Sequence, residues 1–127
     1  MRRRVLLVDD DPVLLEVLST VLDLEEFEVT TALDGREALE RVAQELPQVV
    51  VCDVAMAGID GFEVCRRLRR DPATEQLPVV LLTAHGGPDE HRAGLEAGCD
   101  AFLTKPFSPL ELIELLRSAG DPVSGPG

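Results

Sequence analysis

The chain has 127 residues, 45% of them hydrophobic and 28% charged, and its 24 acidic and 12 basic side chains give a net charge of -12. This composition fits a single globular domain. It excludes a disordered acidic tail, which would lack so many apolar residues, and a disulfide scaffold, which would need more than the 3 cysteines present. Because nucleic acids and anionic lipids are also negatively charged, direct binding of either by this chain is disfavoured.

Five short apolar segments alternate with segments of helical periodicity, a pattern typical of parallel strands joined by crossover helices in an α/β domain. The predicted strands are residues 5–8, 27–32, 49–52, 79–82 and 101–104. The second strand alternates apolar with polar residues, which indicates an edge position. Each apolar run is far shorter than the roughly 20 residues that cross a bilayer, so no membrane span is predicted.

Capping signals mark the start of four predicted helices. The first begins with Asp11 as its N-cap and Pro12 in its first turn. The second, third and fifth begin with capping boxes, in which Glu follows the cap residue three positions later: Asp34 with Glu37, Asp60 with Glu63, and Ser108 with Glu111. The predicted apolar stripes are Leu14, Val17, Leu18, Val21 and Leu22; Ala38, Leu39, Val42, Ala43 and Leu46; Val64, Cys65 and Leu68; and Leu112, Ile113, Leu115 and Leu116.

The fourth predicted helix, over residues 88–97, has the fewest apolar residues at helical spacing of the five. It offers only Ala93, Leu95 and Ala97 as apolar contacts, and two glycines precede it. With so little apolar surface to bury, this segment is expected to be the most mobile part of the domain.

The two ends of the chain differ in character. Residues 120–127 are too rich in Gly and Pro to extend the last helix, so the sequence predicts a domain over residues 1–119, followed by a tail or the start of a linker. At the start, three arginines precede the first apolar run as in a signal peptide, but the run stops at Asp9 before an h-region develops.

Three cysteines, Cys52, Cys65 and Cys99, are widely spaced and lie beside apolar residues. An odd number in this pattern predicts buried free thiols rather than disulfide bonds or a metal site. Free thiols persist in a reducing compartment, so the sequence predicts a cytoplasmic protein.

The residues that could carry chemistry stand directly after four of the predicted strands. They are Asp9 and Asp10 after the first, Asp53 after the third, Thr83 and Ala84 after the fourth, and Lys105, the only lysine, with Pro106 after the fifth. Ligands of an open parallel α/β sheet bind at the carboxyl ends of its strands. Right-handed crossovers can place the first and third strands side by side, which would bring the three aspartates together.

Clustered carboxylates need a cation. Two unit charges about 4 Å apart repel by roughly 4 kcal/mol at an effective dielectric constant of 20, so such groups either take up protons or bind a positive ion. Oxygen ligands without His or Cys favour Mg²⁺. Lys105 and Thr83 could then bind an anion, which indicates a phosphoryl group, and Asp53 is the candidate acceptor because it stands alone at its strand end.

Several neighbouring polar residues have simpler interpretations. Asp11 is favoured as a helix cap over a metal ligand, and Asp60 is also a cap first. His85 and His91 lie in or near a Gly-rich segment without a partner at a useful spacing, so a solvated role is favoured over catalysis.

These motifs together resemble the receiver domain of two-component response regulators, over about residues 4–118. The matching motifs are residues 5–12, Asp53 followed by Met56, Gly58 and Asp60-Gly61, residues 82–84, Ala97-Gly98, and residues 102–107. The resemblance implies a flavodoxin-like (βα)5 fold, a doubly wound five-stranded parallel sheet with strand order 2-1-3-4-5.

The resemblance also implies the site and its chemistry. Asp53 would accept a phosphoryl group from a histidine kinase or a histidine phosphotransfer protein, with no enzymatic turnover beyond this self-phosphotransfer and slow self-dephosphorylation. Mg²⁺ would be the cofactor. Its implied ligands are Asp9, Asp10, Asp53 and the backbone carbonyl of Ala55, and the implied phosphoryl-binding residues are Thr83, Ala84 and Lys105, with Pro106 as a candidate for a cis peptide bond after the lysine.

The resemblance also implies a conformational switch. Thr83 would move toward the phosphate and Phe102 would turn inward, which would remodel the face of the fourth helix, fifth strand and fifth helix. That face would bind a downstream effector protein or a fused output domain, or form a phosphorylation-dependent dimer. The sequence departs from the family at two positions: Ala57 replaces the usual Pro, and Phe102 stands where Tyr is common.

Other functions fit the sequence less well. An Asp-dependent phosphohydrolase would need a nucleophile after the first strand and a cap domain, for which 127 residues leave no room. A nucleotide-binding fold is excluded because no glycine-rich phosphate motif follows the first strand. A receiver-like interaction module that works without phosphorylation remains the alternative, and the complete set of site residues counts against it.

Overall fold

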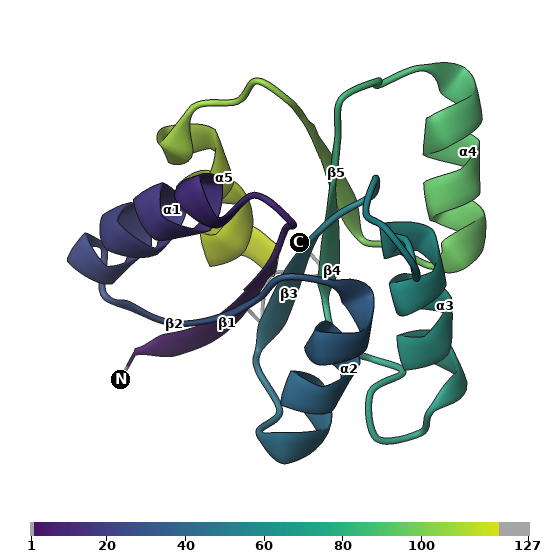
Figure 1. The fold of residues 1–127 in the computed structure, drawn as a ribbon, viewed down its shortest axis with the longest axis horizontal. Helices are drawn as coiled ribbons and strands as arrows, with labels where there is room; N and C mark the ends of the chain where they lie inside the picture. The colour runs from purple at the N-terminus through teal and green to yellow at the C-terminus, as the bar shows by residue number, and fades with distance from the viewer. Residues whose placement is uncertain (1, 120–127) are drawn as a thin grey trace.

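The computed structural model describes residues 2–119, with side chains described for residues 2–118. Five parallel strands form one sheet in the order β2-β1-β3-β4-β5, which confirms the predicted topology (Figure 1). The strands are β1 (Arg3–Val8), β2 (Phe27–Ala32), β3 (Val49–Asp53), β4 (Val79–Thr83) and β5 (Ala101–Thr104). The second and fifth match their predicted ranges, the others extend them by one or two residues, and β2 lies at a sheet edge as predicted.

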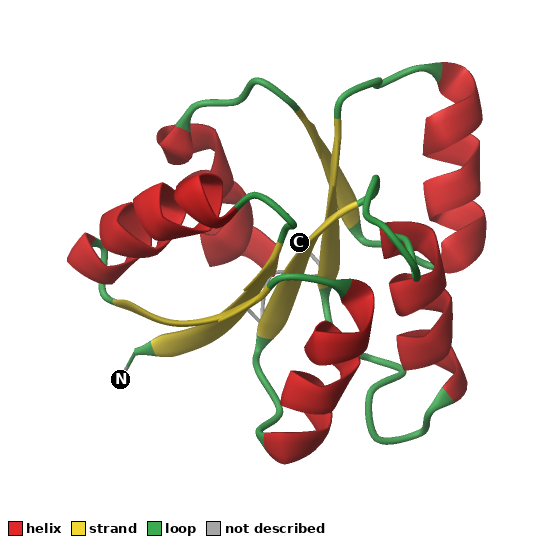
Figure 2. Cartoon of the chain, in the orientation of Figure 1, coloured by secondary structure: helices red, strands yellow, loops and turns green. Residues whose placement is uncertain are grey.

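Helices cover both faces of the sheet, as Figure 2 shows. They are α1 (Pro12–Leu24), α2 (Gly35–Gln44), α3 (Gly61–Arg70), α4 (Pro88–Ala97) and α5 (Pro109–Ala119). One apolar cluster joins α1 and α5 to one face of the sheet, and a second joins α2, α3 and α4 to the other. The central strands β1, β3 and β4 are therefore buried on both sides, which accounts for their continuous apolar sequences.

The predicted helix stripes are only partly correct. In α1 the buried residues are Leu15, Leu18 and Leu22, whereas the predicted Val17 is exposed. Apolar residues occupy more than half of the circumference of this helix, so their spacing alone does not identify the buried arc.

Two other helices show similar differences. Leu46 lies beyond the end of α2 and is exposed, and Leu95 on α4 is 70% exposed, although both were predicted to pack inward. Gly94 and Ala97 are the buried residues of α4. In α3 and α5 the predicted core residues are buried or partly buried.

One of the three predicted capping boxes is complete. Ser108 and Glu111 exchange both side chain–backbone hydrogen bonds, at 3.0 and 3.2 Å. Asp34 and Asp60 cap their helices, but their boxes are not closed. Glu37 accepts from the backbone of Leu33 instead of Asp34, and the carboxylate of Glu63 pairs with arginines on α3. Arginines one turn away thus compete successfully for the Glu63 carboxylate.

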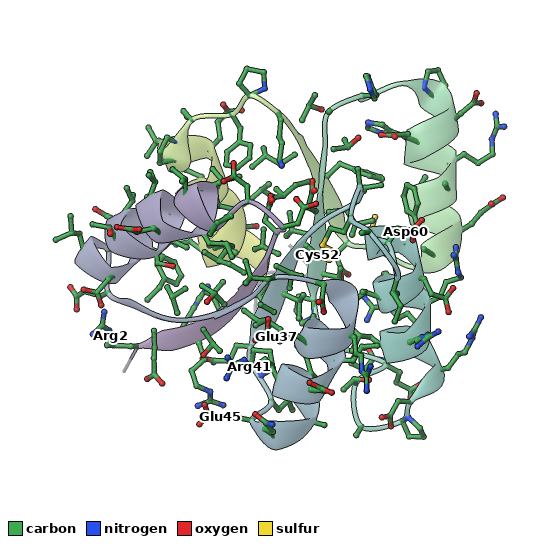
Figure 3. The ribbon with its side chains drawn as sticks, viewed as in Figure 1. Arg2, Glu37, Arg41, Glu45, Cys52 and Asp60 are labelled. Atoms are coloured by element: carbon green, nitrogen blue, oxygen red, sulfur yellow. The ribbon has the colours of Figure 1, made fainter. Side chains whose placement is uncertain are left out.

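The arginines at the start of the chain bind the carboxyl ends of three helices. Arg2 donates to the carbonyl oxygen of Asp23 at the end of α1, and Figure 3 shows it beside the start of β1. Arg3 donates to the carbonyls of Leu116 and Arg117 on α5, at 3.0 and 2.7 Å. Arg4 donates to the carbonyl of Leu46, just after α2, at 3.0 Å. These bonds place arginine donors on carbonyl groups at or just beyond the carboxyl ends of helices, where positive charge is favourable.

The three cysteines are free thiols, as predicted, with Cys52 and Cys65 buried and Cys99 partly exposed. Burial raises the pKa of Cys52 above its usual range and that of Cys65 to about 11, so both are protonated and unreactive at neutral pH. None of the described helices has the length and apolarity needed to span a membrane. The predicted tail, residues 120–127, lies outside the described residues.

Candidate functional site

Parallel pairing of the central strands brings the predicted aspartates together. Val8 pairs with Cys52 across β1 and β3, so the next residues, Asp9 and Asp53, lie side by side at the carboxyl end of the sheet. Asp9 is 2% exposed and Asp53 is 6% exposed, whereas Asp10 faces solvent. One carboxylate oxygen from each of the three lies within 4.8 Å of the others. The sequence prediction of an acidic cluster is thus confirmed in space.

Lys105 joins this cluster from the end of β5. Its Nζ lies 2.9 Å from Asp9 Oδ2 and 3.2 Å from Asp53 Oδ1, so a single ammonium group bridges the two buried carboxylates. Burial alone would lower the pKa of Lys105, but its hydrogen bonds and charge contacts with both aspartates outweigh burial and raise the pKa. The lysine is therefore fully charged at neutral pH.

The pKa of Asp53 is shifted for different reasons. Burial, followed by the charge of Asp9, raises the pKa of Asp53 above its usual value, while Lys105 acts in the opposite direction. These surroundings disfavour the ionised form of the carboxylate. A cation placed beside it would consequently stabilise that form.

The start of α3 packs closely against the backbone of Asp53. A Cβ atom at Gly61 would lie 2.5 Å from the carbonyl oxygen of Asp53, so only glycine allows this approach. Asp60 caps α3 through the backbone N–H of Glu63, and Figure 3 shows Asp60 and Cys52 at this end of the sheet. Ala55 and Ala57, in the loop between β3 and α3, are exposed.

In this structure the hydroxyl of Thr83 hydrogen-bonds to His85 and Glu90 and not to the acidic cluster. Thr83 Oγ1 lies 2.9 Å from the carbonyl oxygen of His85 and accepts from the His85 N–H at 3.0 Å. It also hydrogen-bonds the carboxylate of Glu90 on α4. Thr83 is 1% exposed, so its hydroxyl is enclosed by these contacts, whereas the neighbouring Ala84 is exposed.

Phe102, on β5, packs under α4. A Cβ atom at Gly94 would lie only 1.9 Å from Cζ of the Phe102 ring, so the ring occupies the space that any other residue at position 94 would need. His91 stacks on the same ring with a centroid separation of 4.7 Å. The Lys105–Pro106 peptide bond, at the end of β5, is cis.

The donor set fits Mg²⁺. It consists of oxygen atoms from Asp9, Asp10 and Asp53, with one carboxylate open to solvent, which suits an ion that retains several water ligands. Asp11 is not part of the set, because its side chain caps α1 through the backbone of Val13 and Leu14, as predicted.

Sequence reasoning missed two contacts of the site, those made by Glu90 and Gly94. Glu90 had no distinguishing motif, because its contact with Thr83 depends on the path of the loop between β4 and α4. Gly94 carried a signal that could have been used, since glycine inside a helix is unfavourable unless close packing requires it.

The family model of the response regulator receiver domain matches residues 5–117. Response regulator PleD of Caulobacter vibrioides is 45% identical over 118 residues, which are 93% of this chain and 26% of PleD. The chain spans between about a quarter and a half of the length of most of the curated relatives it matches, such as PleD at 26% and response regulator MprA of Mycolicibacterium vanbaalenii at 49%.

Solved structures agree with this assignment. Chemotaxis protein CheY4 of Vibrio cholerae superposes with a TM-score of 0.89 at 32% identity, over 94% of this chain and 99% of that one. The receiver domain of a sensor histidine kinase from Pseudomonas aeruginosa, described with magnesium in its active-site cleft, superposes with a TM-score of 0.86 at 27% identity, over 94% and 98%. With the fold, the acidic cluster and the family match in agreement, the chain belongs to the response regulator receiver domain family.

Proposed function

We propose that this domain is a phosphoacceptor, in which Asp53 receives a phosphoryl group from a phosphohistidine of a sensor histidine kinase or a histidine phosphotransfer protein. The observation that carries the proposal is the placement of one ammonium group, Lys105 Nζ, on both Asp9 and Asp53. An ion pair with a purely structural role would need only one carboxylate. Two buried carboxylates on one lysine, with a third beside them, leave an excess of negative charge that a divalent cation can neutralise, and the cation together with Lys105 can then bind the anionic phosphoryl group.

The transfer is a displacement at phosphorus. An Asp53 carboxylate oxygen forms the new O–P bond as the P–N bond to the donor imidazole breaks, and the imidazole nitrogen leaves with its electron pair and takes up a proton. The raised pKa of Asp53 favours this step because a more basic carboxylate is a stronger nucleophile. Lys105 stays charged and is placed to contact an oxygen of the transferred group.

Asp9, Asp10 and Asp53, with the backbone carbonyl of Ala55, would hold Mg²⁺. When bound, the ion supplies positive charge beside the phosphoryl oxygens. This part of the proposal is supported by the oxygen donor set and by the related receiver domain that carries magnesium in its active-site cleft.

The proposed output is a change in the surface of α4, β5 and α5. Thr83 and Phe102 both contact α4, and phosphorylation of Asp53 would change what Thr83 binds. The altered surface would bind an effector protein, a fused output domain or a second copy of the chain. We place the protein in the cytoplasm and assign it no enzymatic activity beyond self-phosphotransfer and slow self-dephosphorylation.

Intact-mass spectrometry after incubation with acetyl phosphate tests the function. We expect a single phosphoryl adduct that requires Mg²⁺ and is absent from an Asp53→Asn variant. An Asp60→Asn variant is the matched control, since Asp60 is a nearby aspartate that caps a helix, and it should still form the adduct. A folded wild-type protein that binds Mg²⁺ and forms no adduct with acetyl phosphate or a phosphorylated histidine protein would instead favour a phosphorylation-independent interaction module.

A further inference from the structure

Glu90 stands out because its carboxylate binds a residue of the site without belonging to the acidic cluster. It lies in the first turn of α4, where an acidic side chain usually interacts with the free N–H groups of its own helix. Here it instead reaches the hydroxyl of Thr83 at the end of β4. Among the described residues, the Glu90 carboxylate has no other hydrogen-bond or ion-pair partner.

A threonine hydroxyl has one hydrogen to donate. In this structure two acceptors compete for it, the carbonyl of His85 and the carboxylate of Glu90. A carboxylate is an acceptor only, and the hydrogen bond from a neutral hydroxyl to a charged acceptor is stronger than one to a carbonyl. A phosphoryl group on Asp53 would have to compete with Glu90 for the same hydrogen.

The same side of α4 also holds Phe102. Gly94 follows Glu90 by four residues, so both lie on one face of the helix, and the Phe102 ring fills the space beside Gly94. His91 stacks on this ring. One face of α4 thus contacts both residues that are expected to move on phosphorylation, and few other buried residues hold the helix in place.

From these contacts we propose that Glu90 is a positioning residue that keeps Thr83 and α4 in the unphosphorylated arrangement. This inference rests on the proposed phosphoacceptor function and adds a regulatory residue to it. Thr83 can bind a phosphoryl oxygen only after it leaves Glu90, and its departure removes one of the contacts that hold the first turn of α4. Glu90 therefore sets how readily the domain adopts the phosphorylated arrangement.

A Glu90→Ala variant tests the proposal against a matched control. Asp89→Ala removes the same charge from the same helical turn. The Asp89 side chain is 97% exposed and pairs loosely with Arg92 at 3.7 Å, whereas the hydroxyl of Thr83 bonds to Glu90. Glu90→Gln keeps an acceptor but loses the charge, so its behaviour should lie between that of Glu90→Ala and wild type.

The first measurement is amide hydrogen exchange in protein free of Mg²⁺ and phosphodonor, which does not depend on the proposed function. We expect exchange in the first turn of α4 to be at least about fivefold faster in Glu90→Ala than in wild type, and clearly less affected in Asp89→Ala. Equal exchange in all three proteins would overturn the proposal.

The second measurement is the affinity for beryllofluoride, a phosphoryl mimic, in the presence of Mg²⁺, followed by NMR. Glu90→Ala should bind it at least about fivefold more tightly than Asp89→Ala, because less of the protein is held in the non-binding arrangement. Faster exchange with unchanged affinity would reduce Glu90 to a structural contact and overturn its regulatory role. If wild type takes up neither beryllofluoride nor a phosphoryl group, the proposed function fails and the regulatory role with it, while hydrogen exchange still reports whether Glu90 holds α4.

Discussion

Lys105 and Asp53 lie together at the carboxyl end of the sheet, where the surroundings stabilise the charged form of the lysine and destabilise that of the aspartate. The pKa of Lys105 is raised because two carboxylates share its ammonium group, so the charged lysine is stabilised. The pKa of Asp53 is also raised, by burial and by Asp9, so the charged aspartate is destabilised. The folded protein therefore carries, at Asp53, a free-energy cost that a neutral side chain or a bound cation would relieve.

This cost predicts that Asp53→Asn stabilises the metal-free protein at neutral pH, by about 1 kcal/mol, while abolishing phosphoryl acceptance. The pKa of Asp53 is higher in the folded than in the unfolded chain, so the wild type regains stability relative to the variant as pH falls through the folded pKa. The difference between the two proteins should consequently shrink toward acid. Urea unfolding followed by far-UV circular dichroism measures it, since the chain has no Trp or Tyr. A variant less stable than wild type at neutral pH would contradict this account.

Among the helices, α4 packs closely against Phe102 because residue 94 is a glycine without a side chain. Gly94→Ala should raise helix propensity by about 1 kcal/mol, yet the added methyl group would collide with the Phe102 ring. We expect net destabilisation of roughly 1–3 kcal/mol, because the ring or the helix must shift.

A double-mutant cycle separates these two effects. In a Phe102→Leu background the collision is relieved, so Gly94→Ala should become neutral or stabilising there. Urea unfolding of the four proteins gives the coupling energy. If Gly94→Ala costs the same in both backgrounds, the ring is not what requires glycine at this position.

The carboxyl end of α5 depends on a residue from the other end of the chain. Arg3→Ala removes two hydrogen bonds to the carbonyls of Leu116 and Arg117, which should lower the free energy of unfolding by about 1 kcal/mol. Hydrogen exchange should show the loss in the last turn of α5. Arg36→Ala is the control, because Arg36 is exposed and has only a loose ion pair with Glu40; an equal loss there would assign the effect to charge alone.

The elements were predicted more reliably from the sequence than the contacts between them. The five strands and the acidic cluster could be predicted because apolar runs, strand ends and parallel topology fix where Asp9 and Asp53 must lie. The buried arc of α1 could not, because Val17 and Leu15 are equally apolar. Nor could the partner of Thr83, which depends on the path of the loop leading to Glu90.

For the whole molecule, the net charge of -12 makes every cation stabilising to some degree, through screening of long-range repulsion. A specific Mg²⁺ site must therefore be distinguished from general screening. At about ten times its dissociation constant, a bound ion should stabilise the fold by about 1.4 kcal/mol, or roughly 4 °C in Tm.

We expect MgCl₂ to raise Tm by this amount beyond NaCl of equal ionic strength, as measured by circular dichroism. The excess should vanish in Asp9→Asn, which removes the negative charge of a buried carboxylate of the cluster. It should persist in Asp11→Asn, which keeps a helix-capping side chain outside the cluster. Identical responses to the two salts would argue against a specific ion at this site.

The hydrogen bonds from Arg3 to the end of α5 also connect the last helix to the first strand. Tension applied at Arg117 passes through the guanidinium group into β1, because Arg3 is the first residue of that strand. The strand is hydrogen-bonded to β2 on one side and to β3 on the other, and its last residue is followed directly by Asp9. A displacement of the last helix would therefore disturb a contact of β1, the strand that leads directly to Asp9 of the acidic cluster.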